Sequence, residues 1–208
     1  MGTGAFPIGI DDNARDPIDA GTSALLPAPE PGPIGLDAKS GNAKPTAASM
    51  ADSIVGYARN HRGARVGNGE CFTLADTALR GAGAKSAADF GKVTANADYE
   101  WGTAVTLADL KPGDIIQLRN YSYERVDVTK DDRGTTTDEH AEDRPHHTAI
   151  VQSVDGDGAV TVWEQNAPAG SPVTRTQLFF TDRNTTGDRH STKITVKGQF
   201  WFYRPESR

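Results

Sequence analysis

The chain has 208 residues, enough for one domain with its own hydrophobic core and an appended segment. Its net charge of −6 disfavours nucleic acid and anionic membranes as main partners, because both bind clustered lysine and arginine. No run reaches the roughly 18 apolar residues of a membrane-spanning helix. The single cysteine, Cys71, excludes an internal disulfide and a multi-thiolate zinc site, so it is either a core side chain or a reactive thiol.

Residues 1–48 carry seven of the 12 prolines, and the stretch PAPEPGPIG is typical of extended, polyproline-like chain. We therefore predict a tail or linker at 1–48 and one folded domain at 49–208. A docking or export segment is the functional alternative for the tail. The first residues lack the charged and apolar regions of a signal peptide, so any export is expected to use another route.

Two helices are expected at the start of the domain. In SMADSIVGYARNHRG the apolar residues Met50, Ile54, Val55 and Ala58 recur at helical spacing, and a glycine offers a stop. In RVGNGECFTLADTALRGAGA a glycine-rich turn leads into Cys71, and apolar residues follow on one helical face. Cys71 is thus predicted to lie in the first turn of a helix.

The rest of the domain reads as strands. A turn at Pro112-Gly113 precedes a buried strand, and HTAIVQSV, DGDG and AVTVWEQN have the pattern of a β-hairpin. VTRTQLFF and KITVKGQFWFY add two strands rich in β-branched and aromatic residues. We therefore expect an α+β domain in which N-terminal helices pack on a C-terminal antiparallel β-sheet.

Residues 120–145 are strongly polar and acidic, which is typical of an exposed excursion. A long hairpin and a mobile loop both fit the pattern. A Ca²⁺ site built from Asp131, Asp132, Asp138 and Glu139 lacks the ligand spacing of an EF-hand, so a solvated segment is favoured.

The hairpin places polar side chains together. If its turn centres on Gly156-Asp157, Val154 pairs with Ala159 and His147 lies opposite Asn166. Glu164 shares that face, and directly opposed Cβ atoms lie about 4.5–5.5 Å apart. Neighbouring His146 and Gln165 then point to the other face. A β-bulge would shift this register by one residue.

An imidazole with a polar partner on its second nitrogen is suited to general-base catalysis. A thiol at a helix N-terminus is a suitable nucleophile, because the helix dipole and free N–H groups stabilise the thiolate. The same N–H groups can form an oxyanion hole. The sequence alone does not place Cys71 against His147.

The ordered segments GECF…LADTAL, LKPGDIIQL, HHTAIV and VWEQN resemble the CHAP family (cysteine, histidine-dependent amidohydrolases/peptidases) of the papain-like superfamily. The resemblance covers about residues 50–170. It implies a nucleophile at Cys71, a base at His147, and orienting roles at Glu164 and Asn166, of which either could orient the histidine. It also implies hydrolysis of peptide or amide bonds in bacterial peptidoglycan without a cofactor.

Three features depart from the family pattern. Glu70 stands where many members have glutamine before the nucleophile, and an anion there would repel an oxyanion. His146 replaces a usual glycine, and the acidic insertion is long. A non-catalytic binding module and a secreted effector protease acting on protein are therefore alternative functions.

Three histidines and three tryptophans could also form functional sites. His140, His146 and His147 lie among acidic residues, but they lack zinc-motif spacing. Trp101, Trp163 and Trp201 suit a glycan-binding groove or, more commonly, a small core. We expect a monomer acting on peptidoglycan stem peptides or another peptide, exported or acting at the bacterial cell wall, with an inhibitor or immunity protein as a possible partner.

Overall fold

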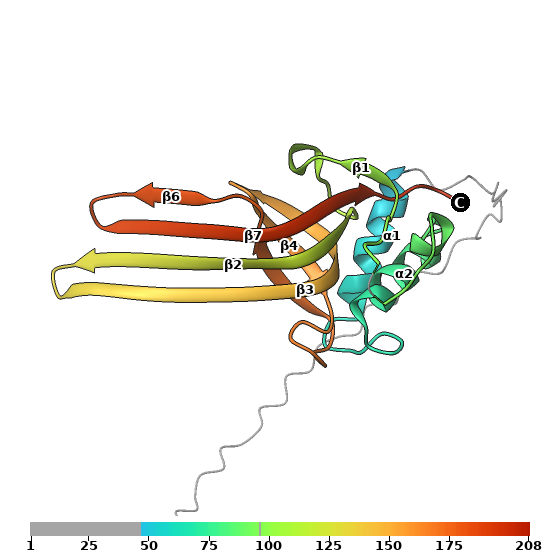
Figure 1. Cartoon of the computed structure of the whole chain (residues 1–208), viewed down its shortest axis with the longest axis horizontal. Helices are drawn as coiled ribbons and strands as arrows, with labels where there is room; N and C mark the ends of the chain where they lie inside the picture. The colour runs from blue at the N-terminus through green and yellow to red at the C-terminus, as the bar shows by residue number, and fades with distance from the viewer. Residues whose placement is uncertain (1–46, 96) are drawn as a thin grey trace, which may run out of the picture. The chain divides into compact units, whose positions relative to one another are not determined.

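A computed structural model describes residues 47–95 and 97–208 (Figure 1). The predicted tail, residues 1–48, lies outside them except for its last two residues. The helices α1 (Ala47–Asn60) and α2 (Cys71–Gly81) come first, and two short 3₁₀ turns flank the first strand. The described strands are β1 (Thr103–Val105), β2 (Ile115–Asp131), β3 (Gly134–Gly156), β4 (Ala159–Glu164), β5 (Thr174–Phe179), β6 (Arg183–Thr186) and β7 (His190–Arg204).

These strands form one antiparallel sheet in the order β1-β7-β2-β3-β4-β5, and β6 pairs with the free side of β7. The predicted α+β class is wrong, because the described part of the chain is mostly antiparallel sheet and has only two short α-helices. The helices have only 14 and 11 residues, whereas β2, β3 and β7 have 17, 23 and 15. The expectation failed because long polar stretches, which lack an apolar alternation, continue as strands by backbone pairing alone.

The helices cover one face of the sheet through a shared core. Met50, Ile54 and Ala58 of α1 are buried at the predicted helical spacing. Helix α2 buries Leu74, Ala75, Ala78 and Leu79, also as predicted. These side chains pack against sheet residues of alternate positions, namely Ile115, Ile150 and Trp163. The core therefore fixes α2, and with it Cys71, against β3 and β4.

The other face of the sheet has a second core. Ile116 and Leu118 of β2 pack there with Val151 of β3 and Phe202 of β7. Because residues on both faces are buried, this end of β2 and β3 lies in the interior of the domain.

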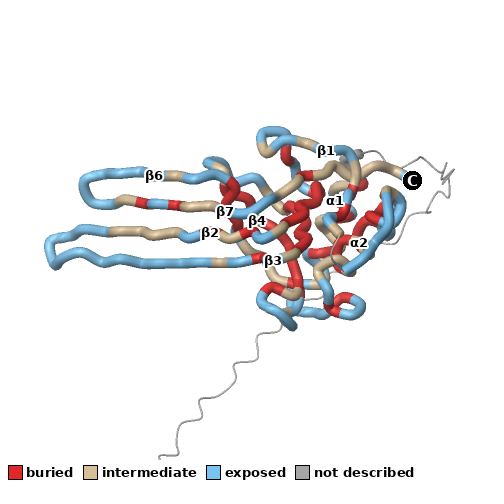
Figure 2. The backbone as a smooth tube through the Cα atoms, in the orientation of Figure 1, coloured by how far each residue is buried: buried red, intermediate tan, exposed pale blue. Residues whose placement is uncertain are grey.

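Beyond the two cores the long strands continue as an arm (Figures 1 and 2). We call the outer parts of β2 and β3, residues 124–141, together with β6 and residues 190–193 of β7, the arm. Strands β2 and β3 stay paired to the tip at Asp131↔Gly134, where Asp131 Oδ1 accepts the N–H groups of Arg133 and Gly134. Of the two possibilities for residues 120–145, the structure is a long hairpin. No helix in the described part of the chain is long and apolar enough to cross a membrane.

Candidate active site

Cys71 is the first residue of α2, as the sequence predicted, and its side chain is half-buried. The loop before it is held by the buried amide of Gln165 at the end of β4. Gln165 accepts the N–H of Val66 at 3.0 Å and donates to the carbonyl oxygens of Val66 at 3.1 Å and Glu70 at 2.7 Å. This buried clamp fixes the start of the helix. The hairpin register predicted that Gln165 points away from the face of His147, but no local pattern indicated a function for it.

The thiol of Cys71 lies beside the edge of β3. Pairing between β3 and β4 ends at Ile150↔Trp163, so the backbone of Thr148 is free to bond to the Cys71 sulfur. Burial alone raises the pKa of Cys71, but hydrogen bonding and the charge of His147, with backbone hydrogen bonds from Thr148 and Phe72, lower the pKa below its ordinary value. The surroundings therefore favour the thiolate.

The imidazole of His147 lies between the thiol and Glu164. It is only 4% exposed, and its Nε2 lies 3.0 Å from Glu164 Oε2. Nε2 has no well-aligned hydrogen-bond partner among the described residues, so this contact is an ion pair rather than a linear hydrogen bond. Burial lowers the pKa of His147, but bonding and charge from Cys71 and Glu164 outweigh it and raise that pKa to about 9. The site thus favours a thiolate beside an imidazolium.

Glu164 is fully buried and is held by a residue that the sequence analysis missed. Arg144 donates from Nε to Glu164 Oε2 at 3.0 Å and from Nη2 to Oε1 at 2.7 Å. Burial raises the pKa of Glu164, but His147 and Arg144 together lower it to about 2. Glu164 is therefore an anion with two cationic partners.

A kink in β2 and β3 explains why Arg144 was missed. Strict alternation places residues 144 and 147 on opposite faces of a strand. In β2, however, Leu118 and Tyr121 lie in the same core, with Asn120 between them at a φ of 48°. Tyr121 pairs with Arg144 and Leu118 pairs with His147, so the kink turns both β3 side chains to the face of Glu164.

The predicted hairpin register is correct only at the end near the site. Val154 pairs with Val160, not Ala159, because the register shifts between Val154 and Gly156 next to the turn. A second shift, between Val151 and Ser153, restores the predicted alignment at Ile150↔Trp163. Glu164 therefore reaches His147 as expected.

Asn166 does not join His147. It lies just beyond β4 with a φ of 66°, and its exposed amide donates to Glu70 Oε2 at 3.0 Å. The left-handed backbone turns the chain out of the strand, which breaks the alternation behind the prediction. Of the two candidates, only Glu164 contacts His147, and Asn166 instead engages Glu70 beside the nucleophile.

Aromatic side chains border the thiol. Phe72 and Tyr99 pack edge to face at 5.1 Å, and Tyr99 lies 5.4 Å from the ring of His146. Burial raises the pKa of Tyr99, and the negative charge of Cys71 raises it further. Tyr99 therefore lies within electrostatic reach of the thiolate. Trp101 and Trp163 are core residues, which argues against a glycan groove built on all three tryptophans.

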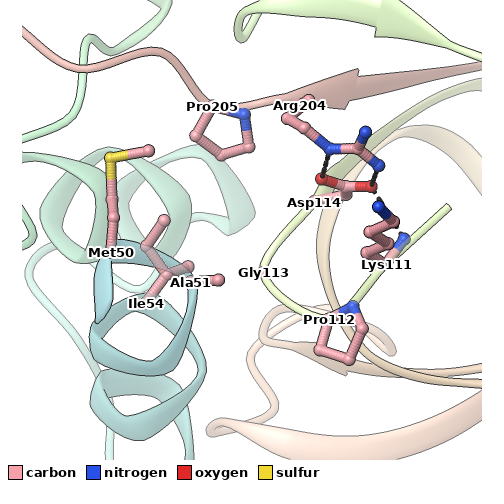
Figure 3. A pocket seen from close by; sticks show the side chains of 9 residues that line it. All are labelled: Met50, Ala51, Ile54, Lys111, Pro112, Gly113, Asp114, Arg204 and Pro205. Carbon is pink, nitrogen blue, oxygen red and sulfur yellow. Dashed lines mark hydrogen bonds and ion pairs between the residues drawn. The ribbon is translucent and has the colours of Figure 1, made fainter. Parts of the chain in front are cut away.

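Outside the Cys71 site, the described residues form a pocket but no metal-binding cluster. Among residues 47–95 and 97–208, no group of three or more potential ligands is arranged to hold a metal ion, and His140, His146 and His147 have separate partners. A pocket of about 320 Å³ lies beside α1 and contains none of the predicted site residues (Figure 3). It is lined by Met50, Ala51, Ile54, Lys111, Pro112, Gly113, Asp114, Arg204 and Pro205.

Comparison with known families adds one finding. Residues 41–207 match the family model described as the AIM3/BBC1 cysteine proteinase-fold domain. The match supports the expected papain-like fold but does not single out the CHAP family. No curated protein and no solved structure matches the chain.

Proposed function

Because the chain belongs to the family of AIM3/BBC1 cysteine proteinase-fold domains, we propose that it is a cysteine-dependent amide hydrolase. The observation that carries the proposal is the contact series Cys71, His147 and Glu164 at the start of α2 and the edge of β3. A binding module that retained only the fold would not need a buried carboxylate–imidazole–thiol series, because such ionised groups are costly to bury.

In the proposed reaction the Cys71 thiolate attacks the carbonyl carbon of an amide, and the C=O electrons move to the oxygen. Within α2 the first N–H that bonds back along the chain is that of Thr73, to the carbonyl oxygen of Glu70, so the N–H groups of Cys71 and Phe72 are the ones that stabilise this oxyanion. The His147 imidazolium gives its proton to the leaving amine as the C–N bond breaks, leaving a thioester. His147 then takes a proton from water, which attacks the thioester and releases the acid and the thiolate.

Each partner of His147 has a separate role in this scheme. Nε2 faces Glu164, so Nδ1 is the nitrogen that exchanges the proton with substrate and thiol. Glu164 orients the ring and stabilises its charge, as the carboxylate does in other triads. The contacts support Glu164 rather than Asn166 in the orienting role, because Glu164 lies against His147 whereas Asn166 donates to Glu70.

The substrate proposed is an amide of peptidoglycan stem peptides. The resemblance of GECF, HHTAIV and VWEQN to wall-active CHAP enzymes supports this substrate. A hydrolase of this kind acts at the cell wall, outside the cytoplasm, and its producer needs protection, for which an inhibitor or immunity protein would serve. A protein cleaved by a secreted effector protease is the alternative substrate.

The test measures free amines released from purified peptidoglycan by the wild type and by Cys71→Ala. We expect release by the wild type and none by the variant, because no other side chain replaces the thiolate. The matched control is Ser153→Ala, an equally small change further along β3 toward the hairpin turn, which should release amines at the wild-type rate. Undiminished release by Cys71→Ala contradicts the proposal.

A parallel incubation with denatured protein assigns the substrate. Cleavage of peptidoglycan alone supports the wall substrate. If only the denatured protein is cleaved, and the cleavage requires Cys71, the proposed reaction stands but its substrate is protein instead of peptidoglycan.

A further inference from the structure

The guanidinium of Arg144 has more partners than one ion pair requires. Two of its nitrogens hold both oxygens of Glu164, and Nη1 donates to Glu142 Oε2 at 2.8 Å and to the carbonyl of Asp143 at 2.7 Å. Arg144 is 4% exposed and Glu164 is 0% exposed. A planar fork held from both sides fixes the carboxylate in position as well as in charge.

We propose that Arg144 is a positioning residue that keeps Glu164 ionised and in place, so that Glu164 holds His147 protonated beside the Cys71 thiolate. The proposal rests on the function proposed above, because it concerns the same site. It extends the series from the nucleophile to Arg144, with Glu142 as the half-buried outer partner.

The surroundings of Glu164 show why such a residue is needed. The titratable groups that face it are Arg144 and His147 from β3, and the phenols of Tyr121 and Tyr123 from β2. Tyr121 and Tyr123 are buried and neutral, since burial holds their pKa values well above 10. Only Arg144 supplies a permanent positive charge, because His147 can lose its proton.

Removing Arg144 has two opposed consequences for His147. A bare Glu164 anion would attract the imidazolium proton more strongly, whereas a protonated Glu164 would not attract it. Burial decides between them, because a carboxyl group with no exposed surface takes up a proton when one of its two cations is removed. We therefore expect His147 to lose its proton more easily and the thiol pKa to rise.

The experiment follows the rate of Cys71 alkylation by iodoacetamide against pH, which needs no substrate. In Arg144→Met the apparent thiol pKa should rise by about one unit or more, which is about tenfold less thiolate at pH values below both pKa values. Arg144→Lys keeps the charge without the two parallel hydrogen bonds, so its thiol pKa should lie between those of Arg144→Met and the wild type.

A second pair of variants tests the route of the effect. Glu164→Gln and Glu164→Gln/Arg144→Met should share one thiol pKa, because Arg144 acts only through Glu164. The double variant also has no lone charge in the core, so it keeps the test available where Arg144→Met does not fold.

The control is Arg204→Met. Arg204 makes a similar double contact to the buried Asp114, at 3.2 and 2.9 Å, on a part of the sheet that does not contact Cys71 or His147. This variant also loses a two-bond ion pair to a buried carboxylate, and its thiol pKa should stay at the wild-type value.

Three results would overturn the inference: a wild-type thiol pKa in Arg144→Met, a further shift on adding it to Glu164→Gln, or an equal shift in Arg204→Met. These are distinct from failure of the proposed function. A low thiol pKa without any amide hydrolysis removes the proposed function alone, and an ordinary thiol pKa in the wild type removes both.

Discussion

Strands β2 and β3 run through two different environments within one continuous ladder. At the inner end, Ile115–Leu118 and His147–Val151 are buried on both faces, whereas the outer end from Thr129 to Ala141 is mostly exposed. Backbone pairing is the same in both, from Ile115↔Ile150 to Asp131↔Gly134. Pairing therefore makes the strands, but only the inner end has the burial that shifts pKa values and assembles a site.

The histidines of β3 give the largest expected contrast. His147→Asn should lower the turnover of the preferred amide by about 10²–10⁴-fold, because it removes the proton-transfer group. His140→Asn changes the same residue type on the arm, where the imidazole is 60% exposed, and should leave turnover unchanged. Steady-state kinetics with matched thermal unfolding distinguish a chemical effect from a loss of fold. Equal losses of turnover in the two variants would contradict the role of His147 as the proton-transfer group.

Truncation of a buried side chain should give the next largest effect. Ile150 has no exposed surface and joins the helices to the sheet, so Ile150→Ala should lower the free energy of unfolding by about 2–5 kcal/mol. Urea unfolding measures it. A loss below about 1 kcal/mol would mean that this core is loosely packed.

The pH dependence of stability should also come from the inner end. The Glu164 pKa falls from its usual 4.5 to about 2 on folding, so its contribution is fully present above pH 4.5 and is lost as the pH falls towards 2. Glu164→Gln should remove on the order of 2 kcal/mol of this acid dependence. Urea unfolding from pH 6 to pH 2 tests it, and identical acid profiles of wild type and variant would contradict it.

The smallest effect is expected on the arm. Thr136→Ala changes an exposed side chain whose strand is held by backbone bonds, so the loss of unfolding free energy should stay below about 1 kcal/mol. The urea series used for Ile150→Ala measures it. A loss as large as that of Ile150→Ala would place part of the core's stability in the arm.

The inner end was also the more predictable part from sequence. The helical spacing before and after Cys71 predicted one buried face for each helix, and the short apolar runs around Ile115 and Ile150 predicted strands. In the arm, the stretch from Thr129 to Ala141 has no such apolar pattern because it is exposed on both faces. Its extent depends on pairing between segments distant in sequence, which a local pattern does not encode.

Within the site, the sequence predicted only those side chains whose direction follows the regular alternation of a strand. Glu164 followed from the period of two, which holds along β4. Arg144 and Asn166 did not, because each lies beside a backbone irregularity: the kink at Asn120 and the positive φ of Asn166 itself. Neither an Asn residue nor the acidic run around Arg144 indicates in the sequence that the side chains change to the other face of the sheet.

The most direct test of the central claim is a titration of the Cys71 thiolate by its ultraviolet absorbance near 240 nm, with Cys71→Ala subtracted at each pH. We expect the Cys71 pKa to lie below about 8.5, the value of an ordinary cysteine, because His147 and the backbone of Thr148 stabilise the thiolate. A midpoint at or above about 8.5 would contradict the assembled thiolate–imidazolium pair.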